Sequence, residues 1–306
     1  MYAAPPDIET TVYARLPESF SRIDQSTPWI EHRGAGPLGS FLEGPSFDRE
    51  GRLYCVDLAH GRIFRISPQG DVEVFADYVG EPNGLKIHKD GRIFVADREH
   101  GVLAFDPVTA ERTVIIGGPA DGERFHGLND LTFSTDGDLY FTDQGDSALE
   151  APYGRVFRLR ATGELDLLLT DLAGPNGLVL SRDEKVLYVA LTRTNQIISA
   201  PLRKDQPGVR KCSVFIQLSG SPVGPDGMAI DTDGNLAVVH AGFGTVWLFS
   251  SMGEPIGRIR SCAGFRTTNV AFGGDDGRTL FITEAQAGVI LQAKVPAPGV
   301  KMFSHC

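Results

Sequence analysis

One short pattern recurs six times along this chain and limits the folds open to it: an apolar run, a tight turn and a second apolar run. The clearest copies read FDREGRLY from Phe47, IHKDGRIF from Ile87 and FSTDGDLY from Phe133. The six turn positions lie about 40 to 50 residues apart, at Gly51, Gly91, Gly137, Glu184, Gly234 and Gly277. Asp-Gly between apolar runs is a strong hairpin signal, because the turn needs a positive φ that glycine adopts without a clash. A repeat of this length is typical of a four-stranded β-propeller blade.

Two further β-type runs follow each of the first five hairpins, which gives four strands per repeat. After the sixth hairpin only one such run remains, at residues 288–292, so the last blade lacks its outer strand. The run at residues 10–15 lies before the first repeat and can supply that strand, which also removes an exposed sheet edge. The sequence therefore predicts an all-β fold: a six-bladed β-propeller with four antiparallel strands per blade, the last blade closed by an N-terminal strand. We expect residues 1–306 to form this single domain.

The charge balance excludes several classes of partner. The chain has 39 acidic and 29 basic residues, a net charge of −10 and no basic run, which argues against nucleic acid and anionic membranes. No stretch approaches the roughly 20 consecutive apolar residues of a membrane helix, and the first residues lack the features of a secretion signal. The four cysteines show no C-x-x-C spacing, so they predict neither a zinc site nor a disulfide framework. We expect a cytoplasmic protein, either a monomer or a small homo-oligomer.

A second regularity lies eight residues before each turn position. The residues there all carry a side-chain carbonyl or carboxylate oxygen: Glu43, Asn83, Asn129, Asn176, Asp226 and Asn269. The innermost strand of each propeller blade lines the central channel, so these six residues should form a ring around the axis. One explanation is turn chemistry, since Pro-Asn-Gly and Pro-Asp-Gly favour turns, but it does not account for Glu43. The other is a hard divalent cation, because oxygen ligands without Cys or patterned His favour Ca²⁺, Mg²⁺ or Mn²⁺.

With these motifs the chain resembles the senescence marker protein 30, gluconolactonase and luciferin-regenerating enzyme family of six-bladed propellers. The resemblance covers about residues 42–290 and rests on EGP at 43–45, ND at 129–130, PNGL at 175–178 and PDGMAID at 225–231. It implies a metal-dependent lactonase in which Glu43, Asn176 and Asp226 hold the cation and Asn129 is a further ligand or a substrate contact. Asp226 would also act as the general base, or as the nucleophile in related phosphotriesterases. The expected cation is Ca²⁺, with Zn²⁺, Mg²⁺ or Mn²⁺ as alternatives.

The chain departs from that family beside Asn129. Animal members carry an arginine two positions earlier, where this chain has Gly127, and bacterial members usually have Ser-Pro where it has Gly127-Leu128. The resemblance therefore does not extend to this sugar-lactone contact, and the class of lactone stays open.

Four further residues are candidates for substrate contact: His126, Tyr153, Asn83 and His240. His126 lies three positions before Asn129 and is either a hydrogen-bond donor at the channel mouth or an ordinary surface histidine. Tyr153 resembles the family's aromatic residue over the site, with loop packing as an equal alternative. His240 ends the second strand of its hairpin, where the first three repeats have Asp57, Asp97 and Asp143. We interpret these strand-end positions as hydrogen-bonding structure rather than catalytic groups.

The predicted function is hydrolysis of a small lactone to its hydroxy acid, with one divalent cation polarising the carbonyl and Asp226 guiding the attack of water. Two alternatives stay open. The same ring can support phosphotriester hydrolysis, or it can hold a structural cation in a propeller that acts as a non-enzymatic scaffold.

Overall fold

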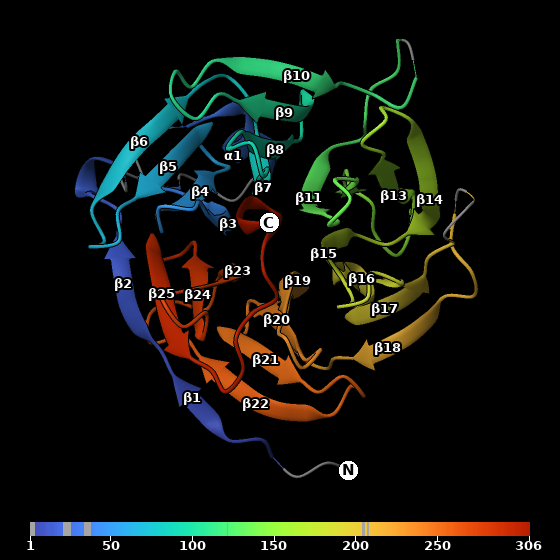
Figure 1. Cartoon of the computed structure of the whole chain (residues 1–306). Helices are drawn as coiled ribbons and strands as arrows, with labels where there is room; N and C mark the ends of the chain where they lie inside the picture. The colour runs from blue at the N-terminus through green and yellow to red at the C-terminus, as the bar shows by residue number, and fades with distance from the viewer. Residues whose placement is uncertain (1–3, 21–25, 34–37, 121, 204–205, 207) are drawn as a thin grey trace.

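Six β-sheets surround a central axis in the computed structural model, which describes residues 4–20, 26–33, 38–120, 122–203, 206 and 208–306 (Figure 1). The first strand of each sheet contacts the first strands of the two neighbouring sheets, so these strands line the channel. The predicted six-bladed propeller is therefore confirmed.

The strands of the first three blades, from the axis outward, are β3 (Leu42–Phe47), β4 (Leu53–Asp57), β5 (Arg62–Ile66) and β6 (Val72–Asp77); β7 (Pro82–Ile87), β8 (Ile93–Asp97), β9 (Gly101–Phe105) and β10 (Arg112–Ile116); and β11 (Leu128–Phe133), β12 (Leu139–Asp143), β13 (Gly154–Leu159) and β14 (Leu165–Leu172). Those of the last three are β15 (Pro175–Leu180), β16 (Val186–Leu191), β17 (Gln196–Pro201) and β18 (Ser213–Gln217); β19 (Gly224–Ile230), β20 (Leu236–Ala241), β21 (Thr245–Phe249) and β22 (Pro255–Arg260); and β23 (Thr267–Gly273), β24 (Thr279–Glu284) and β25 (Val289–Lys294).

All six predicted turn positions adopt the left-handed backbone conformation that a tight hairpin needs. Glycine supplies it in five blades, with φ between 65° and 95°. In the fourth blade Glu184 takes the same role with φ of 54°, although a residue with a Cβ pays a steric cost there. The hairpin geometry is thus retained even in the repeat whose sequence has lost its glycine.

The N-terminal strand closes the last blade as the sequence predicts. Strand β2 (Thr11–Arg15) pairs antiparallel with β25, with Thr11 opposite Gln292 and Arg15 opposite Val289. A second short strand, β1 (Asp7–Glu9), pairs parallel with β22 and makes the fifth blade five-stranded. This addition was not predicted, because three residues are too few to show a strand periodicity. The Asp7 carboxylate accepts a hydrogen bond from Arg258 Nη2 at 3.0 Å and ties β1 to that blade.

The hydrophobic core lies mainly between neighbouring blades. The cluster between the first two blades, for example, joins Val56 and Ile63 of one sheet to Leu85 and Val95 of the next. Each blade is consequently stabilised by burying both of its faces against its neighbours.

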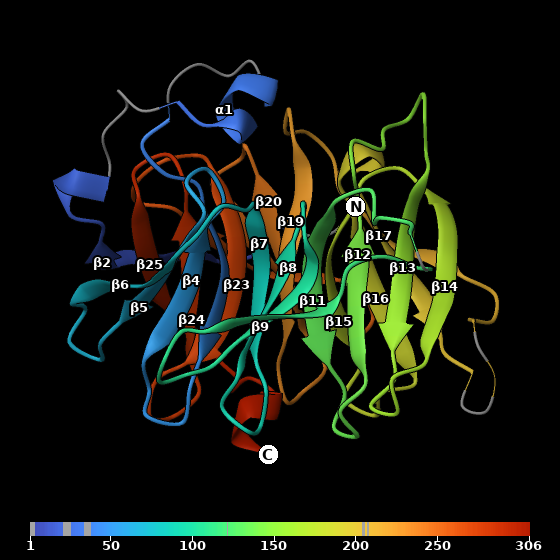
Figure 2. The same cartoon turned by 90° about the horizontal axis from the view of Figure 1, so that it is seen from above.

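Short helical segments lie at the two ends of the channel, with α1 (Pro28–Arg33) at one end and the C-terminal η3 (Phe303–His305) at the other (Figure 2). The remaining turns of 3₁₀ helix are η1 (Glu18–Phe20) and η2 (Thr192–Thr194). Within the described residues, no helix has the length and apolar character needed to span a bilayer.

The closing strand offers a direct stability test. Ala14 is 5% exposed and packs in the core between the last and first blades, whereas Val12 on the same strand is 41% exposed. We expect Ala14→Asp to lower the free energy of unfolding by about 2 kcal/mol or more, because it buries an unpaired charge. Val12→Asp should change it by less than about 0.5 kcal/mol. Urea denaturation measures both, and equal losses in the two variants would contradict the role assigned to this strand.

Candidate functional site

The six predicted ring residues occupy the same irregularity in six strands. The pairing of the first two strands shifts register around each of them, for example between Glu43 and Ser46 and between Pro225 and Met228. A bulge re-aims side chains away from the regular pleat. All six side chains are buried, at 2% to 7% exposure.

Successive ring residues lie against one another because their strands approach very closely. A Cβ on Gly227 would lie 2.1 Å from Asn269 Cγ, and one on Gly177 would lie 2.3 Å from the backbone oxygen of Asp226. A Cβ on Gly44 would likewise lie 2.7 Å from the backbone oxygen of Asn83. The glycine that follows the ring residue therefore allows neighbouring oxygen groups to converge on the axis.

Hydrogen bonds orient two of the ring amides. The Asn129 amide donates through Nδ2 to Gln144 Oε1 at 3.1 Å, and the Asn176 amide donates to Thr192 Oγ1 at 3.1 Å. Since the nitrogens are used in this way, the Oδ1 atoms of Asn129 and Asn176 are the atoms left to bind a cation or a substrate. Sequence reasoning did not identify Gln144 and Thr192, whose role depends on contacts 15 and 16 residues away.

Asn269 differs from the other ring amides. Its Oδ1 accepts the backbone N–H of Val270 at 2.8 Å, and its Nδ2 donates to Glu43 Oε2 and to Asp130 Oδ2, both at 3.2 Å. Asn269 therefore holds two carboxylates in place rather than offering an oxygen of its own.

Asp130 is the channel residue that sequence reasoning missed. Four blades have glycine directly after the ring residue, whereas the third blade has Asp130, which is 2% exposed. Its Oδ1 accepts the backbone N–H of Leu131 at 2.8 Å, and its Oδ2 reaches Asn269, 139 residues away in the sequence. The signal was present in the sequence, because this carboxylate stands where four of the other repeats have glycine.

Negative charge accumulates in this buried space. Burial raises the pKa of Glu43 well above its usual range, and repulsion from Asp226 and Asp130 raises it further. Hydrogen bonds from the Gly44 backbone and from Asn269 lower that pKa and only partly oppose the rise. A cation bound nearby would offset this repulsion and the desolvation of the charges.

Amide oxygens must contribute to any such cation site. Among the residues that the structure describes, no group of three or more His, Cys, Asp or Glu side chains is arranged to hold a metal ion. The Glu43, Asn176 and Asp226 set has only two carboxylates, so neutral oxygens such as the Oδ1 atoms of Asn176 and Asn129 would have to complete it. An all-oxygen donor set of this kind suits Ca²⁺ or Mg²⁺ better than the nitrogen and sulfur ligands typical of structural zinc.

His126 and Tyr153 contact each other on the third blade. Their rings meet edge to face at 5.1 Å, and the Asp146 backbone N–H donates to the Tyr153 hydroxyl at 3.0 Å. Tyr153 is 40% exposed and His126 also reaches solvent, so both side chains are accessible.

His240 is fully enclosed instead. It lies opposite Pro225 across the strand pair, and its Nδ1 accepts a hydrogen bond from Trp247 Nε1 at 3.2 Å. Burial lowers the pKa of His240, which favours the neutral imidazole.

The strand-end carboxylates form hydrogen-bonded structure, as the sequence predicts. Asp57, Asp97 and Asp143 are completely buried. Asp57 accepts the backbone N–H of Phe41 at 2.8 Å, and Asp143 accepts that of Gly127 at 2.9 Å. Each carboxylate thus fixes the loop that leads into its own blade.

Arg98 fills the space beside Gly127, another contact that sequence reasoning missed. A Cβ on Gly127 would lie 3.3 Å from the Arg98 guanidinium carbon. Arg98 follows the second strand of the preceding blade and lies 3.4 Å from a carboxylate oxygen of Glu81 and of Asp146. The loop beside Asn129 therefore packs on a guanidinium supplied by the neighbouring blade.

Known proteins resemble this chain over most of its length. A family model described as SMP-30/Gluconolactonase/LRE-like region matches residues 41–286. Lactonase drp35 of Staphylococcus aureus (strain MW2) is 32% identical over 261 residues, which cover 80% of this chain and 76% of that protein. Lactonase drp35 of Staphylococcus epidermidis is 31% identical over 280 residues, or 88% of this chain and 80% of that protein.

Two solved structures share the fold. The calcium-binding protein regucalcin of Agrobacterium tumefaciens superposes with a TM-score of 0.77 at 21% identity, covering 99% of this chain and 100% of that one. A gluconolactonase of Xanthomonas campestris superposes with a TM-score of 0.74 at 23% identity, covering 97% of this chain and 99% of that one.

The close approach at the axis can be tested with two glycines. Gly227→Ala forces a methyl group against Asn269, so we expect it to lower the free energy of unfolding by about 2 kcal/mol or more. Gly117→Ala is the matched control, because the nearest atom lies 3.8 Å from its new Cβ. Urea midpoints compare the two, and a Gly227→Ala protein as stable as the control would disprove the tight contact.

The electrostatic strain on Glu43 predicts a pH dependence. A carboxyl whose pKa is raised by folding binds its proton more tightly in the folded state, so its contribution to stability falls as pH rises above the unfolded pKa of about 4.3. Without metal, Glu43→Gln should therefore be more stable than the wild type at pH 8 by about 1 to 2 kcal/mol, and the difference should vanish near pH 4.

Thermal unfolding in chelator across this pH range measures the effect. Glu150→Gln, an exposed glutamate, is the control and should follow the wild type at every pH. A Glu43→Gln protein that is less stable than the wild type at pH 8 would show that the carboxylate is not strained.

Proposed function

Because the chain belongs to the SMP-30/gluconolactonase/LRE-like family, we propose that it hydrolyses a small lactone to the corresponding hydroxy acid in the ring at the channel axis. The observation that carries this proposal is the buried convergence of Glu43, Asp130 and Asp226 beside the amides of Asn129 and Asn176. The relatives named as lactonases support the reaction class, since one of them is 32% identical over most of this chain.

We propose one divalent cation, Ca²⁺ in the first place, with Glu43, Asn176 and Asp226 as its protein ligands and Asn129 as a further ligand or a substrate contact. The preference for Ca²⁺ rests on the oxygen-only donor set, and Mg²⁺, Mn²⁺ and Zn²⁺ are the alternatives. When bound, such a cation polarises the lactone carbonyl and stabilises the charge that develops on its oxygen.

The protein's own groups perform the proton transfers. Asp226 accepts a proton from the attacking water as the water oxygen bonds to the carbonyl carbon, a step typically worth about 10² to 10⁴ in rate. The ring C–O bond then breaks, and Asp226 returns the proton to the leaving oxygen, which becomes the hydroxyl of the hydroxy acid. Asn269 acts as a positioning residue, because its amide donates a hydrogen bond to both Glu43 and Asp130.

His126 and Tyr153 are accessible side chains on the third blade, and we propose that they contact the substrate at the mouth of the channel. Asn83 and His240 are buried. We assign them to shaping the channel wall, where the neutral imidazole of His240 adds no charge.

Replacing the proposed base tests the assignment. We expect Asp226→Asn to retain the fold and lose at least about 10²-fold in lactone turnover. Asp233→Asn, an exposed aspartate in the hairpin turn that follows β19, should retain full turnover. A panel of sugar, aliphatic and aromatic lactones in a weakly buffered pH-indicator assay measures both.

Metal dependence is tested in the same assay. Chelation should abolish turnover, and adding back single metals should restore it, Ca²⁺ most effectively. Hydrolysis of phosphotriesters without hydrolysis of any lactone would assign the ring to that reaction instead. Calcium binding without any turnover would support a scaffold with a structural cation.

A further inference from the structure

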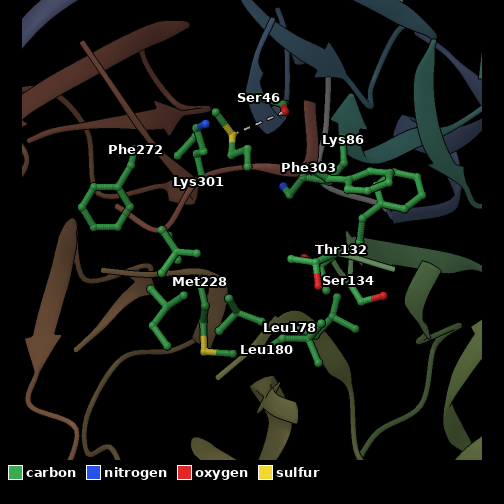
Figure 3. Close-up of a pocket in the computed structure, with 18 of the residues that line it drawn as sticks. Ser46, Lys86, Thr132, Ser134, Leu178, Leu180, Met228, Phe272, Lys301 and Phe303 are labelled. Atoms are coloured by element: carbon green, nitrogen blue, oxygen red, sulfur yellow. Dashed lines mark hydrogen bonds between the residues drawn. The ribbon is translucent and has the colours of Figure 1, made fainter. Parts of the chain in front are cut away.

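A cavity lies on the axis beyond the ring, at the end of the channel where η3 lies (Figure 3). It has a volume of about 160 Å³ and is lined by the later residues of all six innermost strands. None of the six ring residues and none of the three channel carboxylates lines it. The cavity is therefore separate from the proposed active site.

The walls of this axial cavity are mostly apolar. Figure 3 shows Leu178, Leu180 and Met228 on one side and Phe303 on the other. A cavity of about 150 Å³ lined by Leu, Ile and Phe side chains is large enough for a benzene-sized molecule and excludes water when empty. The apolar walls thus favour the hydrocarbon part of a small ligand.

The C-terminal segment closes this end of the channel. Val300 N–H donates to the Ile230 carbonyl on the fifth blade at 3.1 Å. Beyond it Phe303 stacks on Phe133 of the third blade at 5.0 Å, and Arg49 Nε of the first blade donates to the Ser304 carbonyl at 2.7 Å. The segment consequently crosses the axis and forms part of the cavity wall.

Lys86 is a lining side chain whose charge no ion pair neutralises among the described residues. Lys86 is half-buried in β7, and its ammonium donates to the backbone carbonyl of Leu85 at 3.2 Å. In the part of the chain that the structure describes, no carboxylate lies within ion-pairing distance of it, whereas Lys185 and Lys294 pair with aspartates. A partly desolvated ammonium without a counter-ion favours an anion in the adjacent space.

The charged side chains that line the cavity are mostly basic. The lining contains Lys86, Arg182 and Lys301 but one acidic side chain, Glu184. That carboxylate accepts hydrogen bonds from the Thr135 backbone N–H at 2.8 Å and from its hydroxyl at 3.0 Å. It is thus held at the hairpin and does not neutralise Lys86.

We propose that the axial cavity binds a small apolar monocarboxylate, with the carboxylate on the Lys86 ammonium and the hydrocarbon part against Leu178, Leu180 and Met228. Its volume limits the ligand to about the size of a benzoate or a short-chain fatty acid. This site does not depend on the reaction proposed for the ring.

Calorimetric titration of the full-length protein in calcium buffer with benzoate, hexanoate and benzyl alcohol tests the proposal. Lys86→Met should weaken the binding of benzoate and hexanoate at least tenfold. It should leave the affinity for benzyl alcohol unchanged, because benzyl alcohol has the same ring as benzoate without the charge. Thr132→Phe should abolish binding of all three, since Thr132 lines the cavity and an aromatic side chain suits a strand. Lys211→Met is the control for a lost surface charge and should bind like the wild type.

Circular dichroism and melting temperatures establish that each variant is folded. Were Thr132→Phe unfolded, the Lys86→Met comparison between benzoate and benzyl alcohol would still decide the question. The proposal would be overturned if the wild type gave no heat of binding with millimolar benzoate, or if Lys86→Met bound benzoate as tightly as the wild type does. It would also be overturned if Lys86→Met lost as much affinity for benzyl alcohol as for benzoate.

Discussion

The close approach of the six innermost strands at the axis is the constraint on which the rest of the structure depends. Neighbouring strands come so near that glycine must follow the ring residue in four blades. Without that approach, oxygen groups from six sheets could not meet in one buried space. The same approach makes their charges repel, which is visible in the raised pKa of Glu43. Stability is therefore reduced at the place where binding is proposed, as is common for functional sites.

Much of this arrangement was predictable, because each blade carries the same local sequence pattern. The turn glycines predicted the blades and their strand order, and the constant spacing between turn and ring residue predicted the ring. Even Glu184 adopts the expected turn conformation. The closing strand was also predictable, since a count of apolar runs left the last blade one strand short. These features depend on periodicity, which a single sequence displays directly.

The features that were missed depend on contacts between distant parts of the chain. Asp130 meets Asn269 across 139 residues, and Arg98 fills the space beside Gly127 from another blade. Strand β1 is too short for a period, and the C-terminal segment that crosses the axis has none. Such contacts are fixed only when the ring is assembled, so local patterns carry little information about them.

The way the last blade is closed also has a consequence for how the protein is made. Thr11 and Gln292 are partners 281 residues apart, so strand β2 must wait until β25 has been synthesised. During translation five blades can form while the two free edges of the ring stay exposed, and pairings this distant in sequence are slow to form. The nascent chain is therefore most open to edge-to-edge aggregation after five blades have formed and before β25 is available to pair with β2.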